Sequence, residues 1–483
     1  MRKLVFSLPL AKFSVLFRSR TPVLYLVSLV PLVFTVFFAS GLNQPKTLHY
    51  PSMQVVLLLA GRSKRFWPLE EKSLFPIAGT DLLAHQLSLL KKAGLTQITL
   101  VGGAHNLKLI KKQYPKLKII EQEDLDHGMQ GALLSVLLKM KEEAVLVLGG
   151  NDVIEASAIK SLKAAATKGK GAILAKKVER YFPGGYLTVQ KGRILSIVEK
   201  PGAGHEPSDM VNIVAHIHPS PKKLLKALRS TDTGRDDGYE RALTNLMLKT
   251  EYRAVSYSGL WFPVKYPWHL LDLLPHFLET YAKKHKGKKV SVHKTAVIEG
   301  DVYLSDGVRV LPHATIVGPA WIGPGAIIGT NALVRGSSIG ARSIIGYNSE
   351  IKSAILAEDV WTHMSYIGDS VVGSNVAFGG GCTTGNFRLD EGEIVSIVSG
   401  DKVPTGRTKL GAVIGSGTRL GIQVGMNPGV KIGAGTFVSG GAYVTTDIPD
   451  QSYATMKNGN LDIRPNKIST GAAESREKYR KAL

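Results

Sequence analysis

The chain has 483 residues, enough for two or three domains, and 44% of them are hydrophobic against 20% charged, which is the composition of a globular protein with a sizeable core. A single cysteine, Cys382, excludes a disulfide framework and fits a reducing compartment. The formal net charge of +23 points to anionic partners, which include nucleic acid, membranes and phosphorylated metabolites.

The first 52 residues differ from the rest of the chain. They hold six of the cations and none of the acids, and residues 22–42 form an apolar stretch of about 20 residues, long enough to span a bilayer. Arg18 and Arg20 would keep the N-terminus cytoplasmic. The segment is read as an anchor, as a targeting peptide, or as a wrongly assigned start, because Met53 opens a natural first strand. We expect a cytoplasmic enzyme, with membrane contact only if residues 22–42 are an anchor.

From Met53 to about Gly287 short aliphatic runs alternate with helical segments. The pattern predicts an α/β domain over residues 53–287, with a mostly parallel sheet covered by helices on both faces. The predicted strands include 98–103, 117–122 and 144–150, and the predicted helices include 81–94, 131–143 and 156–169. Ligands bind such sheets at the carboxyl ends of the strands, where Gly61 and Asp152 both fall.

The stretch "VVLLLAGRSKRFWPLEEKSLFPIAG" (residues 55–79) ends a buried strand in a small-residue turn followed by cations. Backbone N–H groups in such a turn can approach phosphates closely, and nearby cations stabilise a transferring phosphoryl group. The stretch resembles the signature of sugar-1-phosphate nucleotidylyltransferases. The resemblance implies nucleotide binding at Ala60 and Gly61 and catalytic roles for Arg65 and Lys72. Ser63 stands at the family's second turn glycine, where we expect a conformational cost.

Further segments follow in the order of that family. The resemblance implies base recognition by "EQEDLDHGMQGAL", a Mg²⁺-binding carboxylate in "VLGGNDV" and sugar-phosphate contacts in and after "IVEKP". A single carboxylate on a strand end, together with phosphate oxygens, suits Mg²⁺. The residues at the matching positions are Gln122, Gly128 and Ala132 for the base, Asp152 for the metal, and Glu199, Lys200 and Asn212 for the sugar phosphate.

One departure from the family concerns the second metal ligand. In "GLWFPVKYPWHLL" (residues 259–271), Pro263 stands where the family usually has a metal-binding Asp. Proline has no ligating side chain. Three possibilities stay open: Asp152 holds Mg²⁺ with the phosphates alone, another group such as Asp237 substitutes, or the site is weakened. Lys265, two residues further on, could compensate by its charge.

From about Lys289 the chain has a six-residue period. An aliphatic residue recurs every sixth position with a small or short residue two positions before it, which fits one flat face of a β-solenoid coil per six residues. The aliphatic positions are Ile298, Leu304, Val310, Ile316, Ile322, Ile328 and Val334, and the register resumes at Ile414, Leu420, Met426, Ile432, Val438 and Val444. This pattern resembles the hexapeptide-repeat family, which implies a left-handed parallel β-helix over residues 288–448, an exception to right-handed crossovers.

Two segments depart from the repeat. Residues 384–410 break the sixes and are rich in polar groups, which favours a binding loop. Residues 449–483 are predicted to form a basic tail with one short helix.

The passage "EIKSAILAEDVWTHMSYIGDSVVGSNVAFGGGCTTGNFRLD" (residues 350–390) resembles the acetyltransferase half of bifunctional enzymes that make UDP-N-acetylglucosamine, especially the archaeal type. Acetylation of an amino sugar needs a base that works near neutral pH, and His363 is the candidate. Amino-sugar phosphates need cations. The candidates for the sugar phosphate are Arg335, Lys352 and Lys409, with Tyr366 and Asn386 implied by the resemblance to orient the sugar and the thioester.

The leading hypothesis is therefore a bifunctional enzyme with acetyl-CoA and UTP as cosubstrates, forming homotrimers by analogy with hexapeptide acyltransferases. One alternative is a nucleotidylyltransferase for another sugar and triphosphate, such as dTTP with glucose-1-phosphate, whose β-helix is a scaffold. Another is an acetyltransferase whose first half binds nucleotide without turnover. A third is a non-catalytic regulatory subunit. We expect no nucleic-acid partner, since no aromatic-and-basic module accompanies the charge.

Overall fold

The computed structural model describes residues 53–481 apart from 142, 232–236, 470 and 472. The predictions for residues 1–52, including the apolar stretch 22–42, lie outside the described residues. Among the described residues, no helix combines the length and the apolar character needed to cross a membrane.

The first half contains a nine-stranded sheet, as the alternating pattern predicts. Only β8 and β9 run against the direction of the other strands. The strand order is β3 (Lys118–Glu121), β2 (Ile98–Gly102), β1 (Met53–Leu58), β4 (Ala144–Gly149), β9 (Met210–His218), β6 (Gly171–Lys177), β10 (Tyr252–Ser256), β8 (Arg193–Glu199) and β7 (Gly185–Gln190). A separate short pair is formed by β5 (Asp152–Ile154) and β11 (Trp261–Pro263). In the sequence, β5 follows the carboxyl end of β4 closely.

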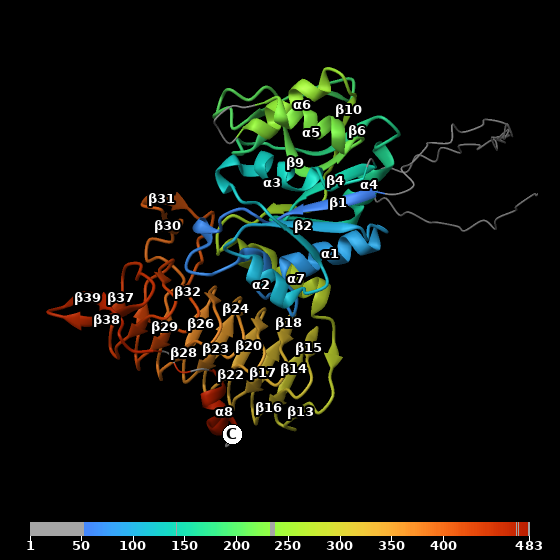
Figure 1. Ribbon diagram of the computed structural model, residues 1–483. Coiled ribbons are helices and arrows are strands. Elements are labelled where there is room, and N and C mark those ends of the chain that lie inside the picture. Colours follow the sequence, from blue (N-terminus) through green and yellow to red (C-terminus); the bar gives the residue numbers. More distant parts are fainter. Residues whose placement is uncertain (1–52, 142, 232–236, 470, 472, 482–483) are drawn as a thin grey trace, which may run out of the picture. The chain divides into compact units, whose positions relative to one another are not determined.

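Helices cover both faces of this sheet (Figure 1). Successive side chains of a strand point to opposite faces. Accordingly Val55 packs in a core cluster with Leu83 and Ile159, whereas Val56 packs in another with Leu133 and Leu243. The helices are α1 (Leu82–Lys92), α2 (Leu107–Gln113), α3 (Gly128–Leu137), α4 (Ala156–Ala165), α5 (Pro221–Arg229), α6 (Gly238–Met247) and α7 (His269–Tyr281), with short 3-10 turns η1 (Lys64–Phe66), η2 (Lys72–Leu74) and η3 (Leu125–His127).

The second half is a parallel β-helix with three faces, which is the left-handed type that the six-residue period indicates. One face is β12 (His285–Lys286), β15 (Val302–Leu304), β18 (Ala320–Ile322), β21 (Ser338–Ile339), β24 (Ile355–Leu356), β27 (Val371–Val372), β32 (Val413–Ile414) and β35 (Lys431–Ile432). The second is β13 (Ser291–Val292), β16 (Arg309–Val310), β19 (Ile327–Ile328), β22 (Ile344–Ile345), β25 (Trp361–Thr362), β28 (Ala377–Phe378), β33 (Arg419–Leu420), β36 (Phe437–Val438), β38 (Ser452–Lys457) and β39 (Asn460–Pro465). The third is β14 (Val297–Glu299), β17 (Thr315–Val317), β20 (Leu333–Arg335), β23 (Glu350–Lys352), β26 (Tyr366–Gly368), β29 (Thr383–Thr384), β34 (Gly425–Met426) and β37 (Tyr443–Val444).

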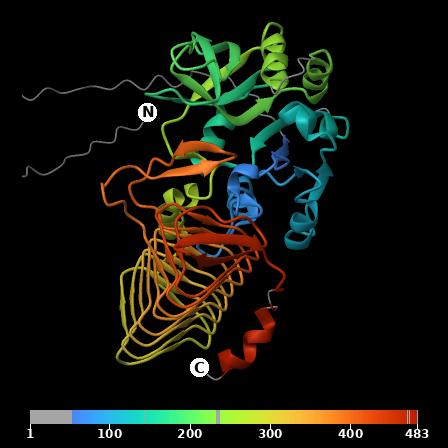
Figure 2. The same ribbon diagram turned by 90° about the vertical axis from the view of Figure 1, so that its left-hand side faces the viewer.

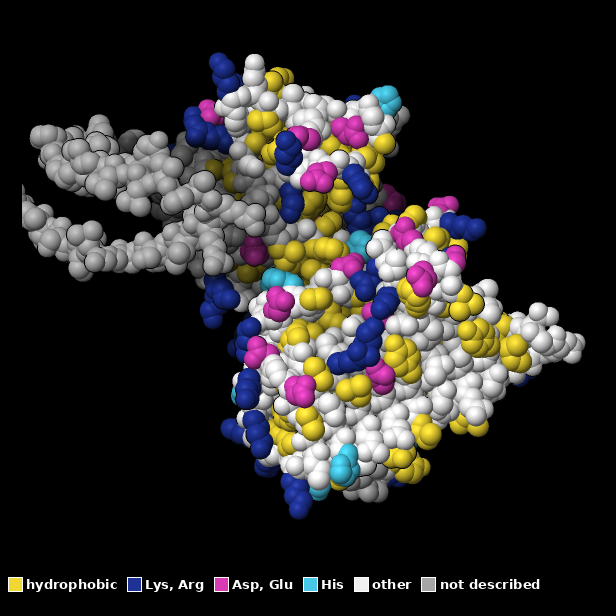
Figure 3. All heavy atoms as spheres, turned by 180° about the vertical axis from the view of Figure 1, so that it is seen from behind, with side chains coloured by type: hydrophobic (Ala, Val, Ile, Leu, Met, Phe, Trp, Pro, Cys, Tyr) yellow, Lys and Arg dark blue, Asp and Glu magenta, His cyan; other side chains and the backbone are white. Residues whose placement is uncertain are grey.

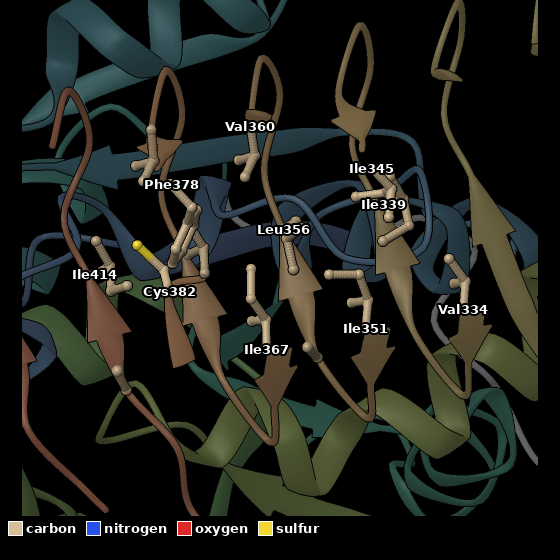
Figure 4. Close-up of a cluster of buried hydrophobic side chains, with 14 of the residues drawn as sticks. Val334, Ile339, Ile345, Ile351, Leu356, Val360, Ile367, Phe378, Cys382 and Ile414 are labelled. Carbon is tan, nitrogen blue, oxygen red and sulfur yellow. The ribbon is translucent and has the colours of Figure 1, made fainter. Parts of the chain in front are cut away.

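The periodic aliphatic residues form the core of this β-helix. Figure 4 shows side chains from successive coils, such as Val334, Ile351 and Ile367, pointing into the same interior. Among the predicted core positions Ile298 is the exception, with 37% of its surface exposed. It lies in the first coil, so it has a neighbouring coil on one side only.

Between the two regular stretches the β-helix continues with shorter coils. Val334 pairs with Ile351, and Ile351 with Ile367, so these coils contain 17 and 16 residues instead of 18. The six-residue register is lost there because the corners of these coils are one or two residues shorter, while the strands of each face still stack. This is why the period cannot be followed through residues 335–384.

Residues 385–411 leave the coils and carry the hairpin β30 (Val395–Val398) and β31 (Asp401–Pro404). Beyond residue 448, β38 still pairs in parallel with β36, and β39 folds back on β38. The tail ends in η4 (Ala473–Arg476) and α8 (Glu477–Lys481), where the sequence predicts a short helix. The Arg476 guanidinium lies 4.7 Å from the ring centroid of Trp361, so the tail packs back against the β-helix.

The two halves share a hydrophobic cluster. Trp268 and Leu271 around α7 pack in it with Ile355 and Val371 from one face of the β-helix, so the first half rests on that face through α7 (Figures 1 and 2). Polar contacts join them as well: the Ala78 N–H donates to Ser338 Oγ over 2.9 Å, Trp67 Nε1 donates to Asp450 Oδ1 over 3.0 Å, and Arg407 pairs with Asp272.

Charged side chains of both signs are interspersed on the face drawn in Figure 3, across the α/β half and the β-helix. The positive net charge is therefore not gathered there into one basic surface.

Candidate active sites

A pocket of about 380 Å³ opens at the carboxyl ends of β1 and β4, where the sequence places the nucleotide site. Its wall brings together residues from segments more than 180 positions apart in the chain. Of the predicted site residues, the pocket is lined by Ala60, Gly61, Arg65, Lys72, Gln122, Gly128, Ala132, Asp152 and Glu199. Lys200 and Asn212 do not line it.

The turn after β1 leaves space for a ligand. A Cβ built on Gly61 would have no protein atom within 4 Å, so the space beside this turn is open. A ligand can therefore approach the backbone N–H groups of the turn closely. The expected cost at Ser63 is not found. Its φ of −68° is a conformation that any residue adopts, so serine replaces the glycine there without strain.

Another part of the pocket lining comes from η3 and α3. Gln122 is buried, and its Nε2 donates to the carbonyl oxygens of Asp124 and Gly128 over 2.7 and 2.9 Å. Gly128 has φ 48° and ψ −133°, a backbone region essentially limited to glycine. Gln122 thus fixes the loop that Gly128 allows, and its contact with a base stays a prediction.

The predicted sugar-phosphate residues of this half lie on β8 and β9 and in the residue after β8. Glu199 Oε1 pairs with the exposed Lys200 ammonium over 3.1 Å. A Cβ on Gly185 would lie 2.6 Å from Asn212 Nδ2 and 3.1 Å from Glu199 Oε2, so glycine at this position leaves room for both polar groups. The cluster adjoins the pocket through Glu199.

The strand pair β5–β11 sets the surroundings of Asp152. In its register Pro263 pairs directly with Asp152, so the proline occupies the place opposite the carboxylate. Asp152 Oδ1 accepts a hydrogen bond from Trp261 Nε1 over 3.2 Å. Burial raises the pKa of Asp152 to about 6, although Trp261 and the ammonium groups of Lys72 and Lys265 act in the opposite direction.

Cations dominate the rest of the pocket. Burial lowers the pKa of Lys72 to about 8, and the nearby Arg65 charge acts in the same direction. Lys265 also lines the pocket, and burial lowers its pKa as well, with Arg65 adding to the effect. Its Nζ lies 4.3 Å from the ring centroid of Phe182 and 3.5 Å from the Pro183 carbonyl oxygen.

Pro263 leaves Asp152 as the single carboxylate that the β5–β11 pair offers to Mg²⁺, the cofactor that the resemblance implies. Hard divalent cations take several oxygen ligands, yet Pro263 offers only a backbone carbonyl, which lies 3.1 Å from His269 Nδ1. Asp237, the suggested substitute, pairs with Arg241 over 2.8 Å and lines another pocket. Within the described part of the chain, no group of three or more His, Cys, Asp or Glu residues is arranged to hold a metal ion.

Two charged groups of the pocket were not predicted. Arg62 lines it and pairs with Asp126 over 2.7 Å, and Glu240 of α6 lines it with 7% of its surface exposed. Arg62 was visible as one of the cations after Gly61. Glu240 carried no signal, because only the packing of α6 against β8 brings it there.

The second site lies on the β-helix face that contains β20, β23 and β26. Arg335 pairs with Glu350 on the next coil, with its Nη2 2.5 Å from Oε1. Lys352 Nζ lies 3.5 Å from Asp369 Oδ2. The same Asp369 oxygen accepts from Asn386 Nδ2 over 2.6 Å, and Asn386 Nδ2 also lies 3.2 Å from Tyr366 Oη. Of the predicted residues, Arg335, Lys352 and Tyr366 thus lie on neighbouring coils of one face, and Asn386 joins them from the start of the excursion 385–411.

Asp369 was missed, although a signal existed. It follows Lys352 by 17 residues and precedes Asn386 by 17, which is the length of a shortened coil. Its carboxylate is buried and joins Lys352 to Asn386, so it positions both groups.

His363 lies at the corner that leads into β26. The corner is stacked between those of the neighbouring coils, since Met364 N–H donates to the Tyr347 carbonyl and Gly381 N–H to that of His363. The imidazole is exposed. Lys409 lies in the excursion 385–411, where it forms a β-bridge with Phe387. Its Nζ lies 5.8 Å from the centroid of the Phe387 ring.

These two sites on these two folds are those of a nucleotidyltransferase joined to a hexapeptide-type acyltransferase, and comparisons with known proteins agree. Residues 54–259 match the Nucleotidyl transferase family. The chain is 31% identical over 411 residues to a "Bifunctional sugar-1-phosphate nucleotidylyltransferase/acetyltransferase" of Sulfurisphaera tokodaii, covering 82% of this chain and 98% of that protein. It is 30% identical over 417 residues to a "Bifunctional protein GlmU" of Methanococcus maripaludis, covering 84% and 98%. The chain belongs to this family of bifunctional nucleotidylyltransferase/acetyltransferases.

Proposed function

We propose that the chain acetylates glucosamine-1-phosphate with acetyl-CoA and then transfers a uridylyl group from UTP to the N-acetylated product, with release of pyrophosphate. The observation that carries the proposal is that each half has its own cluster of polar site residues. One cluster lines the pocket of the α/β half, and the other lies along one face of the β-helix.

The acetyl transfer takes place at the β-helix face. Arg335 and Lys352 bind the sugar phosphate, while Asn386 and Tyr366, both held near Asp369, orient the sugar. His363 removes a proton from the ammonium group of the sugar. The freed amine attacks the thioester carbonyl, a C–N bond forms, the C–S bond breaks, and coenzyme A leaves as its thiol.

The uridylyl transfer takes place in the pocket. The backbone after β1 at Gly61 approaches the triphosphate, and Glu199 with Lys200 holds the sugar phosphate. A phosphate oxygen of the sugar attacks the α-phosphorus, and the bond from that phosphorus to the pyrophosphate oxygen breaks. Arg65 and Lys72 stabilise the leaving charge. No part of this step is assigned to Mg²⁺, because Pro263 stands where a second carboxylate would face Asp152.

We place the enzyme in the cytoplasm, where nucleoside triphosphates are available.

The assembly we propose is a homotrimer. The homotrimer is supported by a strip of exposed apolar side chains at the corner that carries His363. Tyr347, Met364 and Ile422 occupy that corner on different coils with 52%, 57% and 64% of their surfaces exposed. Exposed apolar side chains in a row are typical of a surface that another chain covers.

The test gives the purified chain glucosamine-1-phosphate, acetyl-CoA, UTP and Mg²⁺ and follows free thiol and pyrophosphate separately. Both signals are expected. Thiol without pyrophosphate would leave only the acetyltransferase, or a first half that takes another triphosphate such as dTTP. Pyrophosphate without thiol would make the β-helix a scaffold. Neither signal would favour a regulatory subunit.

A further inference from the structure

We propose that the Lys265 ammonium takes the place of a divalent cation in the pocket, so that the first half binds and transfers its nucleoside triphosphate without a divalent metal ion. The inference rests on the proposed function and concerns the same pocket.

The first support is the register of β5 and β11. Pro263 pairs with Asp152, and the Val264 N–H donates to the Asn151 carbonyl oxygen over 2.8 Å, which fixes the two strands to each other. Position 263 therefore faces the carboxylate but supplies no second one. Within this strand pair Asp152 is thus a single carboxylate, and its Oδ1 already accepts a hydrogen bond from Trp261 Nε1.

The second support is the position of the lysine. Lys265 follows this anchored strand directly and lines the same pocket wall as Asp152, Pro263 and Val264. Its Nζ is held over the ring of Phe182 at 4.3 Å. A lysine ammonium is a compact point charge that binds phosphate oxygens, so it can contact the same triphosphate that Gly61 approaches.

The third support is the balance of charge. Two carboxylates with one divalent cation sum to zero, and one carboxylate with one ammonium also sum to zero. Having Pro263 in place of an Asp and adding Lys265 thus keeps the net charge of such a site while removing one of its two carboxylate ligands. Arg65 and Lys72 line the same pocket and supply further positive charge toward a triphosphate.

The experiment measures UTP binding to the full chain by calorimetry, once in EDTA and once in Mg²⁺. We expect the wild-type Kd in EDTA to lie within about threefold of that in Mg²⁺. Lys265→Met should weaken binding in EDTA by about tenfold or more, the size of a charge-assisted contact to phosphate. Lys160→Met removes the same charge from the exposed side of α4 and should change neither Kd.

A second variant keeps the test independent of any loss of folding in Lys265→Met. Pro263→Asp combined with Lys265→Gly supplies a second carboxylate and removes the ammonium. Its UTP affinity should become dependent on Mg²⁺ by about tenfold or more, as for a site that needs the metal to offset two carboxylates. Pyrophosphate release by the wild type should continue in EDTA.

Three results would overturn the inference. They are a wild-type chain whose UTP binding or pyrophosphate release requires Mg²⁺, a Lys265→Met chain that binds UTP in EDTA as tightly as the wild type, and a double variant indifferent to Mg²⁺. A wild-type chain that binds neither UTP nor dTTP in either buffer would overturn the proposed nucleotidyl transfer itself, and with it the inference. Metal dependence and absence of binding are thus separate outcomes.

Discussion

Single side chains of the two sites have different surroundings. In the α/β pocket the charged groups of Lys72 and Asp152 are largely removed from water, and burial shifts both pKa values toward neutrality. On the β-helix His363 is exposed at a corner, while Lys352, Asp369 and Asn386 are fixed by an ion pair and a hydrogen bond. In the pocket, desolvation therefore shifts the pKa values of the charged groups. On the β-helix face, contacts with neighbouring residues hold the side chains in place.

Replacing His363 by Asn should remove the general base. We expect thiol release from acetyl-CoA to fall by about 10²–10⁴-fold, the usual range for such a residue. Pyrophosphate release from UTP and N-acetylglucosamine-1-phosphate should not change, because that reaction takes place in the other half. His313→Asn is the matched control, since His313 is also exposed at a β-helix corner. A His363→Asn chain with undiminished thiol release would refute the assignment.

The lowered pKa of Lys72 predicts a pH dependence. A lysine whose pKa falls from 10.5 to about 8 through burial loses its charge as the pH rises through 8. Below that pH the ammonium stabilises the leaving pyrophosphate, and above it the contact is lost. Hence kcat/KM for pyrophosphate release should decline above about pH 8.

The control for this pH profile is Lys72→Arg. The guanidinium keeps its charge at every pH at which the protein is assayed. The decline near pH 8 should therefore move upward in this variant, even if its absolute rate is lower. A decline at the same pH in both proteins would assign it to another group.

At the scale of elements, the stacked coils explain why burial is uneven along one face of the β-helix. Ile298, Ile316 and Val334 occupy equivalent positions on β14, β17 and β20. The interior positions have a coil on both sides and are fully buried, while Ile298 has one neighbour only. Each coil thus depends on the next for its core.

Truncation of these two isoleucines should have different effects. Ile316→Ala removes a fully buried side chain and should cost about 2–5 kcal/mol of unfolding free energy. Ile298→Ala, at a position that is 37% exposed, should cost less than about 1.5 kcal/mol. Urea denaturation followed by circular dichroism measures both. Equal costs would show that Ile298 is covered in solution by something outside the described residues.

At the scale of the whole molecule, the α/β half and the β-helix are joined by one core around α7 and by the loop at Gly79. Gly79 has φ +73°, and a Cβ there would lie 2.0 Å from the ring of Trp321 in the β-helix. Glycine at this position allows the two halves to approach closely.

Gly79→Ala should therefore destabilise the joined molecule. We expect a loss of about 1–2 kcal/mol from the left-handed backbone and about 1–3 kcal/mol more from the clash with Trp321. Gly94→Ala is a matched control, since Gly94 has the same φ of +73° and open space around its Cβ position. Thermal denaturation compares the two variants. Equal midpoints would mean that the contact with Trp321 adds nothing to stability.

The sequence by itself determined the two folds and named candidate site residues, most of which the structure gathers in one pocket and on one face of the β-helix. Aliphatic residues at every sixth position predict the β-helix, and the alternation of strand-like and helix-like segments predicts the mixed α/β domain. Both patterns can be read from the sequence because they depend on residues close together in the chain. The motif from Val55 to Gly79 and the block around His363 placed their residues correctly on strand ends and corners. What the sequence could not supply was the absence of strain at Ser63 and the pocket position of Glu240.

Only the tertiary structure decided how distant segments meet. The pairing of Pro263 with Asp152, the entry of Lys265 into the pocket beside Asp152 and the shortened coils that align Lys352 with Asp369 join residues between 17 and 113 positions apart. Such contacts depend on strand register, coil length and the docking of α7. These are set by the packing of the whole chain, so no local pattern of residues records them.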